Sequence, residues 1–567
     1  MNFVEKIGVA SCSWQAFERM LARLLICDGY QNVRQVGGSG DHGADVIATK
    51  YNKRWLIQAK RWNKSVGIDV LNYTLKALKD YNASIPVIAA SHGFDTELKK
   101  QQIVLQSHNI QLQLWDEKAI LQKASRISPT QVSNTKKPRE YQEKAISNIV
   151  QPFLSNYDNR SLIVLATGLG KTFVAAEALR RIQALNSVKV LVLAHSNSLV
   201  YQLEKSFWPF LTAEQSTVVW NGYEHPDLHK GYDFVFACIN TVYEALQKNI
   251  SYDFDIIIVD ECHHAGSPTY RKVLDHYDAG KEGGPFLLGL TATPWRPDDN
   301  DITEYFGLPR ISIDMVFGMQ HGFLTNVDYR MYTDNINWDS LRSFDGHLFS
   351  PKQINRTLFI NQWDDAVVTE LQKAWPEQKN PRAIVFCGTI DHAIKMRDRI
   401  NALGFCNAAA IFSSSKDAPE EQSFYERNRL MCDFSDGIVN VICTVDVFNE
   451  GIDVPDVNII VFQRVTHSRR IFIQQLGRGL RISDDKEKVI VLDFVSDIRR
   501  FAAGLNLKDQ LSVKTSTRVD IPNKVTFRKV GGEDPQTERF LREWLDDVAS
   551  IENSNEDSSI LKYPPRI

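Results

Sequence analysis

The chain has 567 residues, a net charge of −3, an apolar fraction of 43% and eight cysteines without a Cys-x-x-Cys pair. This composition excludes a disordered chain, argues against a zinc ribbon or a disulfide framework, and leaves no global basic field to attract a polyanion. No stretch is apolar over the length of a bilayer, and the first residues lack a signal-peptide pattern. We expect a soluble, cytoplasmic protein of about three or four domains with no membrane partner.

The first predicted element is an amphipathic helix near the N-terminus. Its apolar face is formed at helical spacing by Trp14, Phe17, Leu21, Leu24 and Leu25. Glu18 falls at the edge of this face, where a half-buried carboxylate is unfavourable unless a cation or a hydrogen-bond donor contacts it. Two interpretations of Glu18 stay open: a metal ligand of a catalytic site, or a partly exposed residue in a surface ion pair.

A two-stranded hairpin is predicted after this helix. Residues 40–47 enter the first strand, a short turn follows, and residues 55–60 form the second strand. Because side chains alternate along a strand, Gln58 and Lys60 share a face, and the hairpin register could bring Asp45 beside them. Phosphodiester hydrolysis needs such a set, in which a carboxylate and a second oxygen ligand hold Mg²⁺ and a lysine steadies the attacking water.

This segment resembles the Mrr-type restriction endonuclease domain of the PD-(D/E)xK nucleases. The resemblance implies a magnesium site in which Asp45 and Gln58 are metal ligands and Lys60 is catalytic. Gln58 is the form that Mrr-like members use, whereas the broader superfamily has an acid at this place. A degenerate site that only binds DNA is therefore the alternative.

A basic cluster surrounds the hairpin. It consists of Lys50, Lys53, Arg54, Lys60, Arg61 and Lys64. Trp55 and Trp62 lie between these residues in the sequence, and the mixture suits contact with a phosphate backbone. A charge run on a hairpin is usually only a solvated face, but beside a metal-site pattern we favour a nucleic-acid surface.

A strand, a glycine-rich turn and a helix follow one another within residues 161–179. This order is the context of a P-loop, in which backbone N–H groups and a helix N-terminus bind phosphates. The candidate ATP contacts in the turn are Thr167, Gly168, Gly170, Lys171 and Thr172. Lys171 would reach the β- and γ-phosphates and Thr172 the magnesium of the nucleotide, although Leu165 stands where the strict pattern has its first glycine.

Two acidic residues stand at the end of a second buried-strand run, residues 255–259. The carboxyl end of a strand in an open α/β sheet is where ligands bind. Asp260 is therefore placed to hold the nucleotide's magnesium, and Glu261 to orient or deprotonate the attacking water. An isolated Asp-Glu pair is usually a solvated loop, but this pair follows both a P-loop and a β-branched run.

The P-loop, the acidic pair and several other segments resemble the motifs of superfamily 2 helicases of the DEAD/DEAH and restriction-type group. The other segments are residues 139–142, 193–195, 240–241, 291–294, 384–387, 444–453 and 474–481. The resemblance implies ATP and Mg²⁺ as cofactors. Its further ATP contacts would be Arg139, Gln142, Gly451, Asp453 and Gln474. It also implies that Arg478 and Arg481 reach the γ-phosphate across a cleft and stabilise charge in the transition state.

These observations predict an α/β protein in which a restriction-endonuclease-like α/β domain precedes two RecA-like, doubly wound domains. Strands around residues 383–387, 439–444, 457–462 and 489–494 alternate with helical stretches and indicate the second RecA-like sheet. The expected division is a nuclease domain at 1–125, a linker at 126–137, helicase domain 1 at 138–300, a connector at 301–375, helicase domain 2 at 376–500 and a C-terminal extension at 501–567.

We expect an ATP-dependent DNA helicase or translocase with Mg²⁺-dependent endonuclease activity that restricts foreign or modified DNA, as in prokaryotic restriction and phage-defence proteins. Its partner would be duplex or single-stranded DNA, with defence-system proteins as further candidates and RNA left open. The alternative is a helicase or nucleic-acid sensor ATPase whose nuclease-like domain only binds DNA.

Overall fold

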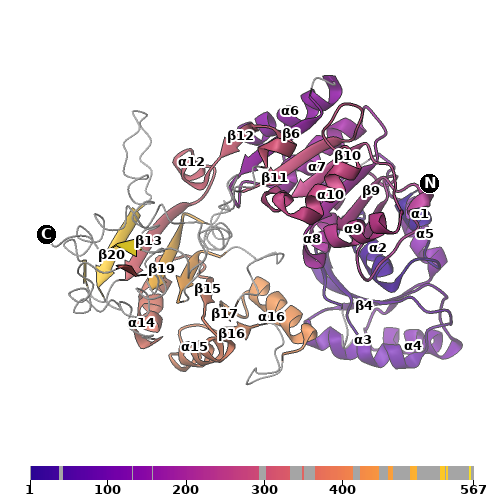
Figure 1. Cartoon of the computed structure of the whole chain (residues 1–567). Coiled ribbons are helices and arrows are strands. Elements are labelled where there is room, and N and C mark those ends of the chain that lie inside the picture. Colours follow the sequence, from indigo (N-terminus) through magenta and orange to yellow (C-terminus); the bar gives the residue numbers. More distant parts are fainter. Residues whose placement is uncertain are drawn as a thin grey trace.

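The computed structural model of the chain describes residues 2–37, 43–130, 132–155, 158–292, 302–332, 348–349, 364–412, 422–445, 457–463, 486–494, 524–529, 532–533 and 561–562. Over these residues the chain is a mixed α/β protein built on three large sheets, as the sequence predicted (Figure 1). A short two-stranded sheet joins β14 (Leu348–Phe349) to β22 (Leu561–Lys562). None of the described helices is long and apolar enough to cross a membrane.

The N-terminal unit is a five-stranded sheet covered by helices. Its strands, in sheet order, are β1 (Gln31–Gln35), β2 (Val46–Lys50), β3 (Lys53–Lys60), β4 (Ile85–Ala90) and β5 (Gln113–Trp115). Its helices are α1 (Phe3–Ile7), α2 (Trp14–Cys27), α3 (Ile68–Asp80), α4 (Thr96–Ser107) and α5 (Glu117–Ser125). The predicted hairpin is confirmed, because β2 and β3 pair antiparallel with Val46 opposite Ile57. β4 and β5 then continue the sheet in parallel.

The apolar face predicted for the first helix is confirmed at every position except one. Phe17, Leu21, Leu24 and Leu25 are buried in the core between α2 and the sheet. Trp14 is 51% exposed. It is the first residue of α2, directly after the N-cap Ser13. Helical spacing places a residue on a face, but whether the first turn of that face is covered depends on the neighbouring elements.

The middle unit is a seven-stranded, fully parallel sheet. In sheet order the strands are β12 (Pro309–Ile313), β6 (Arg160–Leu165), β11 (Phe286–Thr291), β10 (Ile256–Asp260), β7 (Val190–Ala194), β9 (Phe234–Cys238) and β8 (Thr217–Trp220). The helical segments are α6 (Glu140–Ser155), α7 (Lys171–Gln183), α8 (Asn197–Phe207), η1 (Trp208–Phe210), η2 (Leu228–Lys230), α9 (Ile239–Gln247), η3 (Cys262–Gly266), α10 (Pro268–His276), α11 (Thr303–Phe306) and α12 (Met315–Gln320). The five central strands are buried nearly throughout, which explains their continuous apolar runs.

The third unit is an eight-stranded sheet, parallel except at its last pair. In sheet order the strands are β16 (Ala408–Ile411), β17 (Val441–Thr444), β15 (Ala383–Phe386), β18 (Ile459–Phe462), β19 (Lys488–Phe494), β13 (Asn326–Tyr332), β20 (Lys524–Lys529) and β21 (Gly532–Glu533). The helices are α14 (Asp364–Ala374), η5 (Trp375–Glu377), α15 (Ile390–Ala402) and α16 (Phe424–Asp436). The four strands predicted for this sheet are present as β15, β17, β18 and β19.

One strand of the third unit comes from the range expected as a connector. β13 lies between β19 and β20, while β12, which precedes it in the same range, lies at the edge of the middle sheet. Asp328 and Arg330 interrupt the apolar residues of β13, so its sequence does not look like a central strand. The division into domains stays a prediction, and this range contributes to both parallel sheets.

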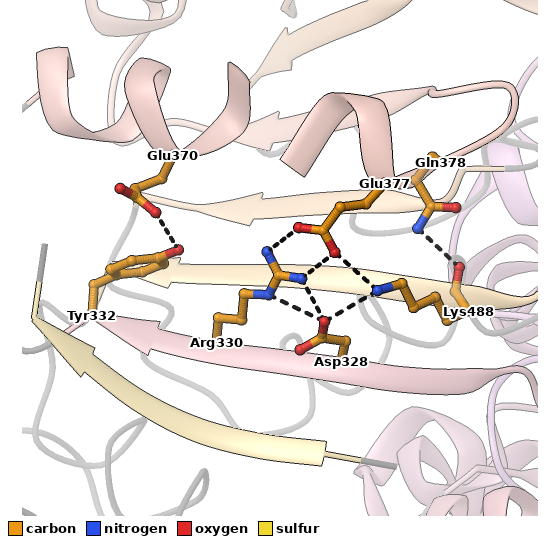
Figure 2. Close-up of polar contacts among 7 residues, drawn as sticks. All are labelled: Asp328, Arg330, Tyr332, Glu370, Glu377, Gln378 and Lys488. Carbon is orange, nitrogen blue, oxygen red and sulfur yellow. Dashed lines mark hydrogen bonds and ion pairs between the residues drawn. The ribbon is translucent and has the colours of Figure 1, made fainter. Parts of the chain in front are cut away.

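Figure 2 shows how the charges on β13 are accommodated. Arg330 is only 5% exposed, and it pairs with Asp328 on its own strand at 2.5 Å and with Glu377 of η5 at 2.6 Å. Lys488, at the start of β19, contacts the same two carboxylates at 3.4 and 2.9 Å. Farther along β13, the Tyr332 hydroxyl donates to Glu370 of α14 at 2.9 Å. Paired charges and satisfied hydrogen bonds let a partly polar strand occupy a covered position.

Candidate active sites

The first site lies in the N-terminal unit, where Asp45 precedes β2 and meets the end of β3. The Asp45 backbone N–H donates to the Ile57 carbonyl at 3.0 Å, which sets the register of the hairpin at this point. The Asp45 side chain is 1% exposed, and its Oδ2 accepts from the Ala59 N–H at 2.6 Å and lies 4.0 Å from Lys60 Nζ. Gln58, from the same face of β3, is 3% exposed and lies beside Lys60. The structure thus brings together the three residues that the hairpin pattern selected.

Glu18 reaches this site from α2, across a glycine. A Cβ atom placed on Gly37 would lie 2.7 Å from Asp45 Oδ1 and 3.1 Å from Glu18 Oε2. The two carboxylates therefore border the small space that the missing side chain leaves. This arrangement favours the metal-ligand interpretation of Glu18 over a remote surface ion pair, although its role stays a prediction.

The donor atoms at this site fit a magnesium ion. Two carboxylates and an amide oxygen are hard oxygen ligands of the kind that Mg²⁺ prefers. Among the described residues, no group of three or more His, Cys, Asp or Glu side chains could hold a metal ion. A metal in the N-terminal unit would therefore depend on Gln58 as well as on the two carboxylates.

The basic cluster of the hairpin is divided between contacts within the protein and open surface. Lys50 pairs with Asp28 at 3.1 Å, and Arg54 pairs with Asp436 of α16 at 2.7 Å. Trp55 is only 8% exposed and packs edge-on against a tyrosine ring in the core, so it is no surface aromatic. Trp62 is 37% exposed, with the Lys64 ammonium 5.8 Å from its ring. The exposed Lys53 and the part of the cluster near Trp62 are what remains for contact with a phosphate backbone.

The second site lies in the middle unit, at the turn between β6 and α7. Gly168 and Gly170 have φ angles of 92° and 85°, a left-handed conformation that residues with a Cβ rarely adopt. Lys171 is the first residue of α7 and Thr172 the second, so both stand at the helix N-terminus. Backbone N–H groups at a helix N-terminus and the helix dipole favour anions, so this turn is a candidate phosphate site.

Gln142, from α6, is fastened to this turn. Its amide donates to the Leu169 carbonyl at 3.0 Å, and the neighbouring Tyr141 hydroxyl donates to the same carbonyl at 3.0 Å. The Arg139 backbone N–H donates to Gln142 Oε1 at 3.0 Å. A Cβ on Gly170 would lie 2.8 Å from Gln142 Nε2, so the glycine also makes room for this contact. The upstream segment and the turn thus form one structural element.

The acidic pair stands at the carboxyl end of β10, facing the turn. Glu261 adopts a left-handed φ of 48°, and its Oε1 lies 3.4 Å from Lys171 Nζ. Burial, and after it the charge of Glu261, raise the pKa of Asp260 to about 7 against the opposing charge of Lys171. A divalent cation would restore the charged form of a carboxylate in such surroundings.

A histidine links this pair to the next strand. His263 Nδ1 lies 3.4 Å from Glu261 Oε2 and 3.0 Å from the hydroxyl of Thr291, the last residue of β11. His263 is 1% exposed, so the link is shielded from water. The contact connects the acidic pair to the segment 291–294, whose last two residues lie outside the described residues.

The remaining predicted ATP contacts belong to the range expected as helicase domain 2. Gly451, Asp453, Gln474, Arg478 and Arg481 all lie outside the described residues. Three residues near the two sites were not selected from the sequence: Gly37, Thr74 and Asn428. They act through packing between elements, which leaves no local pattern in the sequence. His263 closes the acidic segment 260–263, in which the sequence assigned roles to Asp260 and Glu261 alone.

The N-terminal unit is fixed to the middle unit by buried ion pairs. Arg19 of α2 lies 2.6 Å from Glu204 and 2.6 Å from Glu224, and all three residues are at most 5% exposed. Burial lowers the pKa of Arg19, but the two carboxylates outweigh this effect and raise it overall. Arg23 donates to the backbone carbonyls of Thr212 and Gln215 at 2.9 and 2.7 Å.

The N-terminal unit also contacts the third unit through α16, which lies beside the end of α3 (Figure 1). The Asn428 amide donates to the Val36 carbonyl at 2.9 Å, and the Tyr425 hydroxyl donates to Asp80 at 2.5 Å. The Val36 backbone N–H in turn donates to the Asp45 carbonyl at 2.9 Å. A helix of the third unit is therefore separated from the first site by a single residue.

Three family models match the chain in order. The restriction endonuclease model (Mrr_cat) matches residues 9–123, the model for the res subunit of type III restriction enzymes matches residues 135–296, and the helicase conserved C-terminal domain matches residues 365–483. The chain carries a restriction endonuclease domain joined to a two-part helicase. The resemblance inferred from the motifs is thereby confirmed for these domains, and the helicase domains imply nucleotide binding.

Curated relatives are similar over about two thirds of this nuclease–helicase chain. A type I restriction enzyme EcoAI endonuclease subunit from Escherichia coli is 28% identical over 397 residues, which are 65% of this chain and 47% of that protein. A DNA 3'-5' translocase XPB2 from Sulfurisphaera tokodaii is 24% identical over 62% of this chain and 80% of that protein. The nuclease–helicase chain thus spans about half the length of the restriction subunit.

One solved structure shares the fold over nearly the whole nuclease–helicase chain. The ATP-dependent Type ISP restriction-modification enzyme LlaBIII bound to DNA aligns with a TM-score of 0.51 and 16% identity. The alignment covers 95% of this chain and 42% of that chain. At this identity the likeness shows the arrangement of the fold alone.

Proposed function

We propose that this nuclease–helicase chain uses ATP to move along or open DNA and cuts phosphodiester bonds with Mg²⁺, restricting foreign or modified DNA. The observation that carries the proposal is that Asp45, Gln58 and Lys60 lie together in a domain fastened to both parts of a helicase. The restriction and helicase families that match the chain support both activities. The protein would act in the cytoplasm on DNA, with defence-system proteins as further partners.

In the nuclease reaction, Asp45, Gln58 and Glu18 would hold the magnesium ion. When bound, the ion supplies a Lewis acid that polarises the scissile phosphate and lowers the pKa of a water. The Lys60 side chain is 17% exposed and lies 4.0 Å from Asp45, so its ammonium can reach both the site and the solvent. It would donate a hydrogen bond to the attacking water and orient it toward the phosphorus.

In the ATPase reaction, the turn before α7 and Lys171 would bind the phosphates. Thr172 and Asp260 would hold the magnesium of the nucleotide. Lys171 contacts Glu261 at 3.4 Å. When Lys171 turns toward the phosphates, Glu261 is left to accept the proton of the attacking water. Arg478 and Arg481 complete this proposal as the residues that sense domain closure.

We further propose that ATP licenses the cutting. The buried pairs at Arg19 fix the N-terminal unit to the middle unit, whereas Asn428 of the third unit holds Val36. Because both Val36 and Gly37 donate their backbone N–H to the Asp45 carbonyl, a movement of α16 relative to the middle unit displaces the strand beside Asp45. Closure of the helicase around ATP would therefore change the geometry of the nuclease site.

The test is cleavage of plasmid DNA with Mg²⁺, in parallel with and without ATP. The wild-type chain should cut only with ATP, and Lys171→Ala should neither hydrolyse ATP nor cut. Lys60→Ala should lose cutting and keep DNA-stimulated ATP hydrolysis. Lys76→Ala, an exposed lysine on α3, is the matched control and should behave as wild type. Unchanged cutting by Lys60→Ala would overturn the nuclease assignment.

Gln58, in place of an acid, favours a second candidate function: a helicase or sensor ATPase whose N-terminal domain only binds DNA. This candidate predicts ATP hydrolysis on DNA with no cutting under any condition. Stimulation by duplex RNA but not by DNA would instead point to an RNA sensor.

A further inference from the structure

A buried threonine contacts the amide of Gln58 from the helix that covers the nuclease site. Thr74 lies in the middle of α3 and is 0% exposed, and its hydroxyl is within hydrogen-bond distance of the end of the Gln58 side chain. The same hydroxyl lies 2.8 Å from the Val70 carbonyl, one turn earlier in α3. Among the predicted residues of the nuclease site, the Thr74 hydroxyl is hydrogen-bonded to Gln58, so we expect its effect on the chemistry to act through Gln58.

The protons of these groups decide how the amide is oriented. A hydroxyl has one proton, and a carbonyl oxygen can only accept, so the Thr74 proton goes to the Val70 carbonyl. Thr74 must then accept from Gln58, which places the amide nitrogen toward α3. In this orientation the nitrogen also donates to the Val70 carbonyl at 3.0 Å, and the amide oxygen accepts from Lys60 Nζ at 3.2 Å. The opposite orientation would set carbonyl against carbonyl and amide N–H against ammonium.

We infer that Thr74 and the Val70 carbonyl are a positioning pair that turns the Gln58 oxygen toward Lys60 and the metal site, and that this site requires an amide at position 58. The inference rests on the proposed nuclease function and specifies its metal site.

A carboxylate at position 58 has no N–H group to donate. One of its oxygens would face the Val70 carbonyl at about the distance of 3.0 Å that the amide nitrogen now occupies. Two oxygens with no proton between them, buried away from water, repel each other and raise the free energy of the site at this contact. The carboxylate would have to turn away or take up a proton. The contacts made by α3 therefore require an amide at position 58. Gln58 is not a weakened replacement for the acid of the broader superfamily.

The test compares Thr74→Val, Thr74→Ser and Gln58→Glu in the full-length chain. Valine keeps the shape of threonine and removes the hydroxyl, whereas serine keeps the hydroxyl. Some residues hydrogen-bond to a metal ligand without touching the metal. Replacing such a residue typically lowers metal affinity or activity by about 10- to 100-fold. Thr74→Val should therefore raise the Mg²⁺ concentration for half-maximal cutting roughly tenfold, and Thr74→Ser should stay near wild type. Gln58→Glu should lose activity rather than gain it.

Binding of Mn²⁺ without nucleotide gives a second readout, with Asp45→Ala as the blank. Thr74→Val should weaken the Asp45-dependent binding by a similar factor, while DNA-stimulated ATP hydrolysis stays unchanged and reports an intact fold. Equal Mn²⁺ binding by Thr74→Val and wild type, greater activity of Gln58→Glu, or no Asp45-dependent Mn²⁺ binding at all would each overturn the inference. If the wild type binds Mn²⁺ through Asp45 but never cuts, the proposed function fails. The inference is then decided by whether Thr74→Val binds Mn²⁺ more weakly than Thr74→Ser.

Discussion

Replacing Asn428 with alanine tests the link between the helicase and the nuclease site. The substitution removes the one side-chain amide that donates to the Val36 carbonyl, at 2.9 Å, and leaves the backbone of α16 intact. Both partners are partly buried, and a neutral hydrogen bond of this kind contributes about 0.5–1.5 kcal/mol. A loss of about 1 kcal/mol changes an equilibrium roughly fivefold.

The expected result is that ATP-dependent cutting falls about fivefold relative to ATP hydrolysis. The ATPase itself should stay near wild type, because the Asn428 side chain donates to Val36 of the N-terminal unit and is not one of the predicted ATP contacts. The assay measures initial rates of plasmid cleavage and of phosphate release in the same reaction, at saturating Mg²⁺. The ratio of the two rates is the quantity that reports the coupling.

Asn380→Ala is the matched control, because Asn380 is an exposed asparagine of the third unit whose backbone carbonyl, the acceptor for Asn458, is kept in the alanine variant. Its ratio of cutting to hydrolysis should equal that of wild type. If Asn428→Ala shows the wild-type ratio as well, the contact between α16 and Val36 does not transmit the nucleotide state. A parallel fall in both rates would show a general loss of the fold instead.

Three further outcomes are expected. Arg19→Met leaves two buried glutamates without their cation and should lower the free energy of unfolding by about 3–5 kcal/mol, measured in denaturant; a change below about 1 kcal/mol would show that the interface rearranges. Gly37→Ala places a methyl group between two carboxylates and should abolish cutting at low Mg²⁺, whereas Gly222→Ala, with open space around it, should not. Hydrogen bonds from Arg330 lower the pKa of Glu377 below its ordinary value of 4.5, so the stabilisation they provide is present above that pH and is lost as the pH falls through the lowered value. The pH dependence of unfolding in this acidic window should flatten in Arg330→Met, and an unchanged profile would contradict the assignment.

Much of both sites could be predicted because their residues are close together in the sequence. The strand, turn and helix of the P-loop are consecutive, and the glycines of that turn are required by its left-handed backbone. Asp45 and Gln58 are brought together by a tight hairpin, whose side-chain alternation is visible in the chain itself. In both places the local backbone geometry requires particular residue types. The resulting sequence pattern can therefore be recognised without the rest of the fold.

The strands of the third unit show which kind of strand a local sequence pattern does not predict. β15, β17, β18 and β19 are buried on both faces and therefore appear as apolar runs. β13 carries Asp328 and Arg330, and its central position becomes favourable only because Glu377 and Lys488 complete a charge network around it. Partners that are distant in the chain compensate the buried charges, and no window of the sequence contains them.

The sequence by itself determined which candidate groups the chain carries: a glycine-rich turn before a helix, an acidic pair after a buried strand, and a carboxylate–amide–lysine hairpin. The tertiary structure alone decided how these parts depend on one another. Packing of α3 on β3 sets the orientation of Gln58 through Thr74, and docking of α16 joins Asn428 to Val36, 392 residues away. Side-chain periodicity is a property of neighbouring residues, whereas the contacts that orient an amide or connect two domains exist only once separate elements have packed together.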